Sequence, residues 1–350
     1  MNNHFQNIAV LQTAFLGDVA LAMPLCKALK SIYPNSRLTF ITTKAASPIA
    51  EIVSSIDEVI VFDKRNAHSG FKGTFAFGKF LKEFKFDLFI SLHRSFRSSL
   101  IAKLAKADFS ISYDTATLSF LFDKKCKYRL HEHEIRRNLN FLECIGKGEL
   151  IDEFDNPAVN LNFPDYDINY VEQYLNQIGN KSDKTALIAP NSVWETKKWT
   201  KTGYINSAEI LTNRGFNVLI IGSQSDKDYC DEISQKSGAI NTCGIFTIPQ
   251  TIYLMKKAQF LVCNDSAPIH FAGMVNCPIV AIFGPTSPLF GFYPRSRQST
   301  VIERAELDCK PCEIHGNKKC PLGTFDCMNL IKAEEVANAA NNITSTQTAQ

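Results

Sequence analysis

The sequence predicts an α/β fold made of two Rossmann-like domains, each built around a parallel sheet. Short apolar runs typical of buried strands alternate with helical patterns in both halves of the chain. This alternation stops once, near the middle, in the Asp-, Asn- and Pro-rich stretch DEFDNPAVNLNFPDYD. With 350 residues, the chain is long enough to form two domains with separate cores.

The expected domains are residues 1–155 and 169–330, joined by a linker at 156–168. The expected strands are 8–12, 38–42, 58–62, 86–92 and 109–113 in the first half, then 185–189, 217–222, 260–263 and 279–283. The expected helices are 19–32, kinked or restarted at Pro24, then 48–54, 75–83, 98–106, 132–145 and 168–177. A last helix is expected at 331–343, and the Ser/Thr/Gln-rich residues 344–350 predict a disordered tail.

Composition excludes several classes of protein. A net charge of +3 is too small to argue for nucleic acid binding. Eleven cysteines are an odd number, and most are scattered singly, which favours reduced thiols over a secreted disulfide framework. The N-terminal apolar run lacks a basic start and is interrupted by Gly17, Asp18 and Pro24, so we expect neither export nor a transmembrane span, and a cytoplasmic location.

The most informative stretch, residues 256–288, reads as a strand, a turn, a helix and a second strand. In parallel sheets, ligands bind at the carboxyl ends of strands, where a helix N-terminus attracts anions. Asp265 or Ser266 can cap this helix, and His270 lies one turn further on. The pattern therefore predicts a negatively charged ligand that carries a diphosphate.

Several motifs resemble the bacterial heptosyltransferases, the ADP-heptose:lipopolysaccharide transferases of glycosyltransferase family nine. QTAFLGDVALAMPLCKALK at 12–30 resembles their glycine–aspartate loop, and NSVWETKKWT at 191–200 resembles their lysine–x–tryptophan stretch. Residues 264–288 are similar to their NDSGPxH block, which is the most specific of these motifs. His131-Glu132 with Arg136 and Arg137 resembles the family's His-plus-basic helix, and the tail CKPC…C…CM resembles the heptosyltransferase II branch.

This resemblance implies the GT-B architecture, with the two domains facing each other across a cleft. It also implies an inverting transfer of heptose from ADP-L-glycero-D-manno-heptose to the inner core of lipopolysaccharide in a Gram-negative bacterium, with no cofactor required. One alternative is an enzyme of the same architecture that uses another donor or acts on sugar nucleotides. A second alternative is a protein that binds nucleotide sugars without catalysis. In the GT-B enzymes the last helix commonly packs back on the N-terminal domain, which makes that packing an expectation for 331–343.

Asp18 is the candidate catalytic base, because the matching position in the family holds the catalytic aspartate. Without the resemblance, a cap for a helix that begins at Val19 is the favoured interpretation. The candidate donor-binding residues follow strand ends or match family positions, and Lys197 and Lys198 compete for the diphosphate. They are Ser192, Lys197, Ser223, Gln224, Asp265, Ser266, Ala267 and His270. Ala267 and Gln224 depart from the family's usual glycine and glutamate, and Asp226 is a substitute for the latter.

The acceptor is expected on the N-terminal domain. Basic side chains after its strands favour an acidic acceptor such as the Kdo-containing inner core joined to lipid A. The candidates are Arg94, Arg97, Arg136 and Arg137, with Lys64 and Arg65 nearby. Because such acceptors are anchored in the inner membrane, weak peripheral contact with that membrane is expected. Phe71, Phe75 and Phe77 are candidates for this contact, although a buried helix face explains them equally well.

We expect catalysis without a metal ion, because the acidic pairs Asp165/Asp167 and Asp226/Asp228 lie in the linker and at a helix start. Cys309, Cys312, Cys320 and Cys327 leave a structural zinc site as an alternative. Packed free thiols or a local disulfide are favoured over zinc, because the later cysteines do not form a second CxxC pair.

Overall fold

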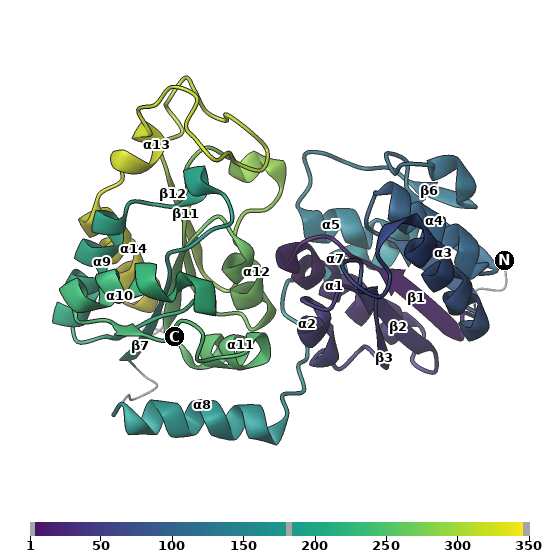
Figure 1. The fold of residues 1–350 in the computed structure, drawn as a ribbon, viewed down its shortest axis with the longest axis horizontal. Coiled ribbons are helices and arrows are strands. Elements are labelled where there is room, and N and C mark those ends of the chain that lie inside the picture. Colours follow the sequence, from purple (N-terminus) through teal and green to yellow (C-terminus); the bar gives the residue numbers. More distant parts are fainter. Residues whose placement is uncertain (1–3, 180–183, 346–350) are drawn as a thin grey trace. The chain divides into compact units, whose positions relative to one another are not determined.

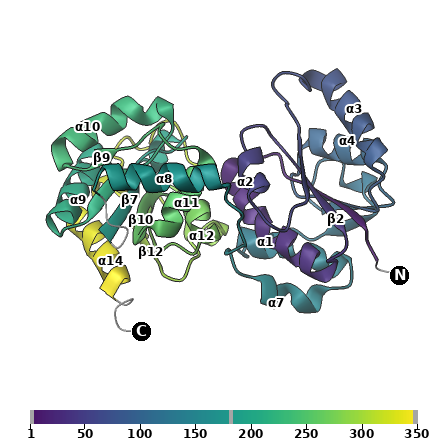
Figure 2. The same cartoon turned by 90° about the horizontal axis from the view of Figure 1, so that it is seen from below.

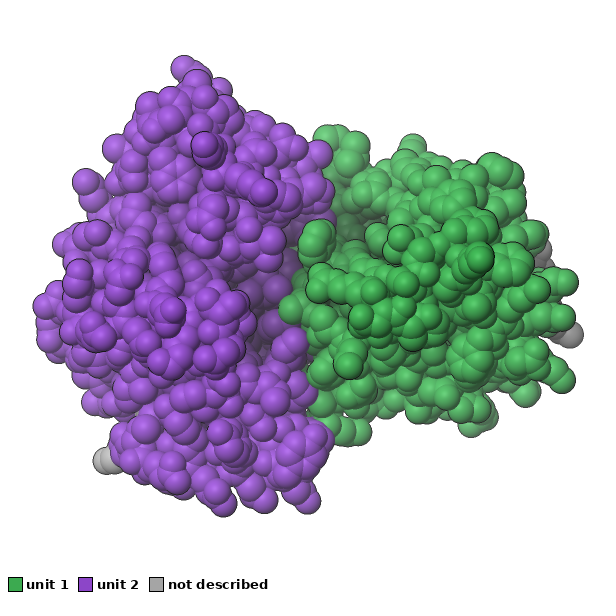
Figure 3. All heavy atoms as spheres, viewed as in Figure 1, with its two compact units in different colours: residues 1–162 green, residues 163–350 purple. Residues whose placement is uncertain are grey.

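The structure is a computed structural model that describes residues 4–179 and 184–345. The chain divides into two compact units, Met1–Asn162 and Phe163–Gln350 (Figures 1 and 3). The division falls inside the stretch expected as linker. Most of the tail expected to be disordered, residues 346–350, lies outside the described residues, and 344–345 end the last helix.

Unit 1 contains a six-stranded parallel sheet in the order β3-β2-β1-β4-β5-β6. Its strands are β1 (Asn7–Leu11), β2 (Arg37–Thr42), β3 (Glu58–Val61), β4 (Leu88–Ser91), β5 (Phe109–Tyr113) and β6 (Lys124–Cys126). Its helices are α1 (Leu16–Ile32), α2 (Ser47–Glu51), α3 (Gly70–Leu81), α4 (Phe96–Ala105), α5 (Glu134–Leu139), α6 (Phe141–Cys144) and α7 (Ile151–Phe154).

Unit 2 contains a second parallel sheet in the order β12-β11-β10-β7-β8-β9. Its strands are β7 (Thr185–Ala189), β8 (Asn217–Ile220), β9 (Ile240–Asn241), β10 (Phe260–Asn264), β11 (Ile279–Phe283) and β12 (Ser299–Glu303). Its helices are α8 (Asp165–Gln177), α9 (Lys201–Asn213), α10 (Lys227–Ser237), α11 (Ile248–Lys257), α12 (Ala267–Met274), α13 (Asp326–Asn329) and α14 (Ala333–Ser345).

The two sheets share one topology. In each, the first strand lies centrally, the next two strands continue to one side, and the fourth returns to the other side of the first strand. This is the Rossmann order, and it places a topological switch point between β1 and β4 in unit 1 and between β7 and β10 in unit 2. The predicted class, two Rossmann-like domains with parallel sheets, is confirmed.

Helix α1 runs from Leu16 through Pro24 to Ile32 without the expected restart. Pro24 and its neighbours Met23 and Leu25 are buried, so apolar packing outweighs the lost backbone hydrogen bond. The earlier start of the helix places Asp18 in the first turn rather than ahead of it. The helix expected at 132–145 is divided into α5 and α6 at Asn140.

Helix α14 packs within unit 2, against α9 and the strands β10–β12, instead of on the N-terminal domain as expected (Figure 2). Its apolar side joins the unit's core through Val336, Ala337, Ala340 and Ile343. The Arg214 guanidinium of unit 2 donates to the carbonyl of Ala337 at 2.8 Å. The helix therefore completes the core of the unit that it follows in sequence.

Candidate functional site

In unit 2, the neighbouring strands β7 and β10 carry the candidate donor residues on the loops that follow them. The loop after β7 leads through Ser192 to a short turn at Glu195–Lys197 and then to α9. The loop after β10 contains Asp265 and Ser266 and leads directly into α12. Both loops leave the sheet at its switch point, which is the usual ligand position in open α/β sheets.

Lys197 and Asp265 form the central ion pair of this region. The Lys197 Nζ lies 2.6 Å from the Asp265 Oδ2, and both side chains are nearly buried. The same carboxylate oxygen accepts a hydrogen bond of 2.7 Å from the Thr286 hydroxyl, which follows β11. Lys198 instead pairs with the exposed Glu195 at 2.7 Å. Of the two lysines, Lys197 is therefore the one that faces the loop after β10.

Asn264, the last residue of β10, fixes the loop after β7. Its side-chain oxygen accepts from the Trp199 backbone N–H and from the Tyr204 hydroxyl, both at 2.9 Å. Its amide nitrogen donates to the carbonyl of Pro190 at 2.7 Å. Because the amide of this buried residue is satisfied on both sides, it holds the segment that carries Lys197. The sequence alone does not indicate this role of Asn264.

The N-terminus of α12 differs from the expectation. Ser266 is the N-cap residue, but neither its side chain nor that of Asp265 caps the helix. The first helical residue is Ala267, so the amide groups of this turn lie beside the Lys197–Asp265 pair. Pro268 has no N–H and the Ile269 N–H donates to the Ser266 carbonyl at 3.1 Å, so this turn offers an anion the Ala267 N–H and the positive end of the helix.

His270 lies in the next turn of α12. Burial lowers its pKa to about 4, with Asp265 opposing this change and Lys197 reinforcing it. The imidazole is therefore neutral at pH 7, with one nitrogen that donates and one that accepts. Its ring lies 6.4 Å from that of Phe292, in an edge-on arrangement. A neutral His270 can bind a sugar hydroxyl or a phosphate oxygen without adding charge.

Three further donor candidates lie on loops of the same unit and have local partners. The Ser192 hydroxyl accepts from the Trp194 N–H at 3.4 Å. Ser223 donates from its backbone N–H and its hydroxyl to the Asp226 carboxylate, at 2.8 and 2.6 Å. Gln224 lies so close to Gly244 that a Cβ there would come within 2.1 Å of the Gln224 Oε1. Asp226 thus anchors the loop after β8.

In unit 1, Asp18 lies in the first turn of α1, after β1, and is half-buried. Its Oδ2 accepts a hydrogen bond of 3.0 Å from the N–H of Phe15, the N-cap residue. The carboxylate therefore stabilises the helix start from within the first turn, and not as the cap of a helix that begins at Val19. A carboxylate has several acceptor positions. Capping is thus compatible with a second role.

A buried polar cluster, formed by Tyr128, Glu134 and Arg137, lies near Asp18. Arg137 donates to the Glu134 carboxylate at 2.8 Å and to the Tyr128 hydroxyl at 3.1 Å. Burial raises the pKa of Glu134 to about 7; Arg137 lowers it, and the negative charge of Asp18 raises it further. The Arg94 guanidinium lies over the ring of Tyr128, 4.0 Å from its centroid. Glu134 is not among the residues predicted from the sequence, because its burial is a product of the tertiary fold.

His93 follows β4 and forms a second polar group at this switch point. Its Nδ1 lies 2.8 Å from the Thr13 hydroxyl and 3.0 Å from that of Ser98. Burial lowers its pKa to about 4, and the charges of Lys64 and Arg94 act in the same direction. Lys64, after β3, donates to the Thr13 carbonyl at 2.9 Å. These contacts join the loops after β1, β3 and β4.

The four acceptor candidates separate into two kinds. Arg94 and Arg97 are exposed, on the segment that leads from β4 into α4. Arg136 forms ion pairs with Asp152 and Asp155, and Arg137 is buried in the polar cluster. The adjacent His133, rather than His131, is buried, and its Nδ1 accepts from the Ile135 N–H at the start of α5.

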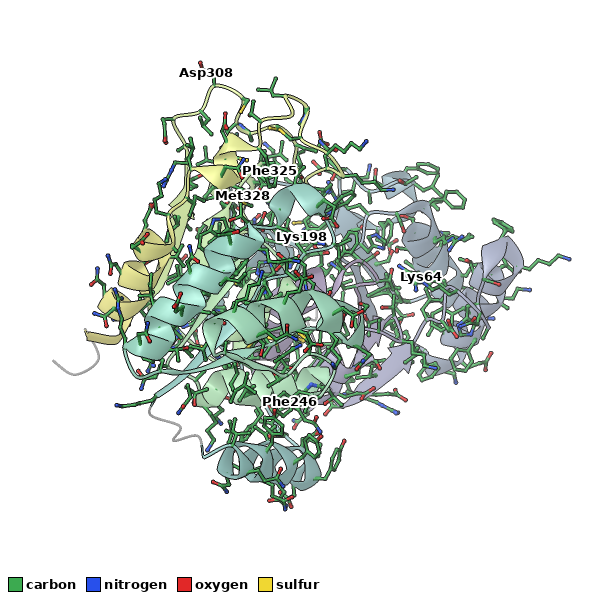
Figure 4. The ribbon with its side chains drawn as sticks, turned by 60° about the vertical axis from the view of Figure 1, so that its left-hand side comes forward. Lys64, Lys198, Phe246, Asp308, Phe325 and Met328 are labelled. Atoms are coloured by element: carbon green, nitrogen blue, oxygen red, sulfur yellow. The ribbon has the colours of Figure 1, made fainter. Side chains whose placement is uncertain are left out.

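The four C-terminal cysteines line one small pocket, together with Thr196, Pro285 and Phe325, and Figure 4 labels Phe325. All four thiols are free. Within residues 4–179 and 184–345, no group of three or more His, Cys, Asp or Glu side chains is arranged to hold a metal ion. No helix in these same ranges is long and apolar enough to cross a bilayer.

The fold and the two switch-point sites define a two-domain glycosyltransferase of the GT-B class. Residues 74–322 match the model of glycosyltransferase family 9 (heptosyltransferase), and the chain belongs to this family. It is 25% identical over 296 residues to the lipopolysaccharide core heptosyltransferase OpsX of Haemophilus influenzae, covering 81% of this chain and 80% of that protein. It is 23% identical to the lipooligosaccharide heptosyltransferase 2 of Campylobacter jejuni serotype O:2, covering 94% and 95%.

Solved structures agree with this fold. A family 9 glycosyltransferase from Veillonella parvula aligns with a TM-score of 0.86 at 21% identity, covering 99% of both chains. The ADP-heptose LPS heptosyltransferase II of Escherichia coli aligns with a TM-score of 0.77 at 20% identity, covering 98% of this chain and 100% of that chain. The chain thus spans nearly the full length of both structures.

Proposed function

We propose that this glycosyltransferase moves heptose from ADP-L-glycero-D-manno-heptose to the inner core of lipopolysaccharide. The main support is the Lys197–Asp265 pair beside the N-terminus of α12, in a chain of the heptosyltransferase family. Relatives named as heptosyltransferases of lipopolysaccharide or lipooligosaccharide match it over most of their length. The heptose and the lipopolysaccharide core follow the names of those relatives, and the ADP-heptose donor follows the name of the aligned Escherichia coli heptosyltransferase II.

On the donor side, Lys197 and the amide groups at the start of α12 stabilise the ADP leaving group. As the bond from the sugar to the diphosphate breaks, negative charge grows on the phosphate oxygens, and fixed positive groups lower the barrier. Asp265 and Thr286 hold the Lys197 ammonium in position. Ser192, Ser266, Ala267 and His270 bind the sugar phosphate, and Ser223 and Gln224 bind the nucleoside.

On the acceptor side, Asp18 takes the proton from the attacking hydroxyl. A carboxylate in that position makes the oxygen nucleophilic as the sugar acquires oxocarbenium character. A single displacement then inverts the anomeric centre. Arg94 and Arg97 bind the acidic groups of the acceptor, because exposed guanidinium groups offer paired donors to carboxylates and phosphates.

Catalysis proceeds without a metal ion in this proposal. Lys197 and the helix start supply the positive charge that a divalent cation supplies to the diphosphate in other transferases. The four C-terminal cysteines act as packed thiols. The enzyme works in the cytoplasm, in peripheral contact with the inner membrane, where the lipid-anchored acceptor is located.

The test combines donor binding with turnover. Calorimetry with ADP, UDP, GDP and ADP-heptose in the presence of a chelator should give selective binding of the adenine ligands. Asp18→Asn should bind ADP-heptose normally and reduce kcat by about 10²- to 10⁴-fold, the usual contribution of a general base. Preferential binding of UDP or GDP would mean that the donor carries a nucleotide other than ADP. Unchanged turnover of the Asp18→Asn variant would exclude Asp18 as the base.

A further inference from the structure

Helix α3 of unit 1 exposes aromatic side chains on the side that faces away from the core. Phe71, Phe75 and Phe80 have 64%, 38% and 51% of their surface exposed. The sequence leaves open whether the aromatic residues of this segment are buried. The structure divides them, because Phe77 is buried in the core while these three are not. Exposed aromatic residues gathered on one element mark an interaction surface more often than scattered ones do.

The buried side of α3 fixes this orientation. Phe77 and Leu81 belong to the core cluster of the sheet face that α3 covers, and α3 packs along α4. Gly78 lets the two helices approach closely, since a Cβ there would come within 2.7 Å of Leu104. Rotation of the helix to bury Phe71 would therefore expose Phe77, and rotation the other way to bury Phe80 would expose Leu81. The three phenylalanines are held outward by the packing of the opposite side.

The exposed side is also basic. Lys72 and Lys79 lie on it, and Lys82 and Lys85 follow directly after the helix, all exposed. Glu83 is the single acidic residue between Gly70 and Lys85. The Lys79 Nζ lies 4.7 Å from the centroid of the Phe75 ring, so positive charge and aromatic surface form one patch. Such a combination fits the interface of an anionic bilayer, where rings enter the headgroup layer and ammonium groups contact phosphates.

We propose that the exposed side of α3 binds the surface of an anionic membrane. At about 3.6 residues per turn, this α3 patch places Phe71, Phe75, Lys72 and Lys79 within an arc of about 100°, and Phe80 lies at its far edge, about 80° beyond Lys72. The inference rests on the proposed function only in that a lipid-anchored acceptor gives the enzyme a reason to be there. The contact is peripheral and reversible, because three rings and a few lysines bury far less apolar surface than a spanning helix does. It brings unit 1 to the lipid surface.

Vesicle co-sedimentation tests the proposal with the full chain. The protein should bind phosphatidylcholine vesicles that contain phosphatidylglycerol, and binding should weaken at high salt. The triple variant Phe71→Ser/Phe75→Ser/Phe80→Ser should lose affinity at least tenfold. Lys72→Glu/Lys79→Glu should reduce binding to anionic vesicles by a similar factor, since each lysine near such a surface contributes roughly fivefold. Equal binding by wild type and both variants would overturn the proposal.

The matched control is Tyr166→Ser/Tyr170→Ser, which removes two exposed aromatic side chains from α8 of unit 2. It should leave vesicle binding unchanged, and a loss equal to that of the triple variant would count against a specific patch. Light scattering tests whether a second copy of the chain binds the α3 patch instead of a membrane. If the wild type is a dimer and the triple variant is a monomer, the patch is an interface between copies. ADP-heptose affinity is measured in parallel. Vesicle binding without ADP-heptose binding would contradict the proposed function but support the proposal for the α3 patch.

Discussion

The Lys197–Asp265 pair and the Lys198–Glu195 pair differ in burial although their lysines are adjacent. Lys197→Met should weaken ADP binding about 10- to 100-fold, because it removes a charge-assisted contact worth roughly 1.5–3 kcal/mol. It also leaves the nearly buried Asp265 carboxylate beside the incoming diphosphate without its cation. Calorimetry with ADP measures this effect directly.

Lys198→Met is the matched control for that experiment. Its partner Glu195 is largely exposed, and surface ion pairs contribute about 0–1 kcal/mol, so ADP affinity should change by less than about fivefold. A larger loss in the Lys198 variant than in the Lys197 variant would reverse the assignment of the diphosphate contact.

Glu134 gives the stability of the protein a defined pH dependence. In the unfolded chain this carboxyl group has its ordinary pKa of 4.5, whereas burial raises its pKa in the folded state to about 7. Between these values the folded state retains a proton that the unfolded chain has lost, so the free energy of unfolding falls as pH rises through this interval. At roughly 1.4 kcal/mol per pH unit, the loss amounts to about 3 kcal/mol.

Glu134→Gln removes this titration. Urea unfolding at several pH values between 4.5 and 7.5 should show wild type losing stability relative to the variant as pH rises, with little further change above pH 7.5. The exposed Glu149→Gln is the control for removal of one carboxylate. A wild-type-minus-variant difference that does not change with pH would contradict the buried position of Glu134.

At the scale of the element, α14 is part of the core of unit 2. Val336 is fully buried in that cluster, so Val336→Ala should lower the free energy of unfolding by about 2 kcal/mol through lost contacts and an unfilled space. Glu334→Ala, two residues earlier and on the exposed side, should change it by less than about 0.5 kcal/mol. Chemical unfolding of the two variants compares them. Similar small effects would mean that α14 is not part of the core.

The central elements could be predicted from the sequence because their signals are local. The ends of β5, β7 and β11 match their apolar runs, since these strands are covered on both faces. The edge strands β6, β9 and β12 were missed: β9 has only two residues, and β6 has three, two of them exposed lysines. The partner of α14 was wrong because an amphipathic pattern reveals a buried side but not which surface buries it.

The candidate site could likewise be predicted only where its residues carry a local sequence signal. Asp18, Lys197 and Asp265 follow strands in the sequence, so the rule for carboxyl ends placed them at sheet edges. The contacts between them were not visible, because Asp265 was read as a helix cap and is instead the partner of Lys197, over sixty residues away. Glu134 and His93 carry no sequence signal beyond their residue type. Their altered pKa values result from burial that only the folded chain produces.

At the scale of the whole molecule, the proposed chemistry is divided between two units with separate cores. The contacts that Asp265 makes with Lys197 and Thr286, and that Asn264 makes with the Lys197 loop, lie within unit 2. The apolar cluster around Trp199 and Val336 also lies wholly within that unit. The proposed base, Asp18, belongs to unit 1. Donor binding and proton removal should therefore be separable.

A fragment of residues 163–350 should fold alone, since a compact α/β domain of this size buries enough apolar surface for independent stability. It should unfold cooperatively, bind ADP with an affinity within about tenfold of the full chain, and transfer no sugar, because it lacks Asp18. The same fragment with Lys197→Met is the control and should bind ADP poorly. A folded fragment that does not bind ADP would mean that residues of unit 1 complete the nucleotide site. Binding that survives Lys197→Met would move the diphosphate contact elsewhere in unit 2.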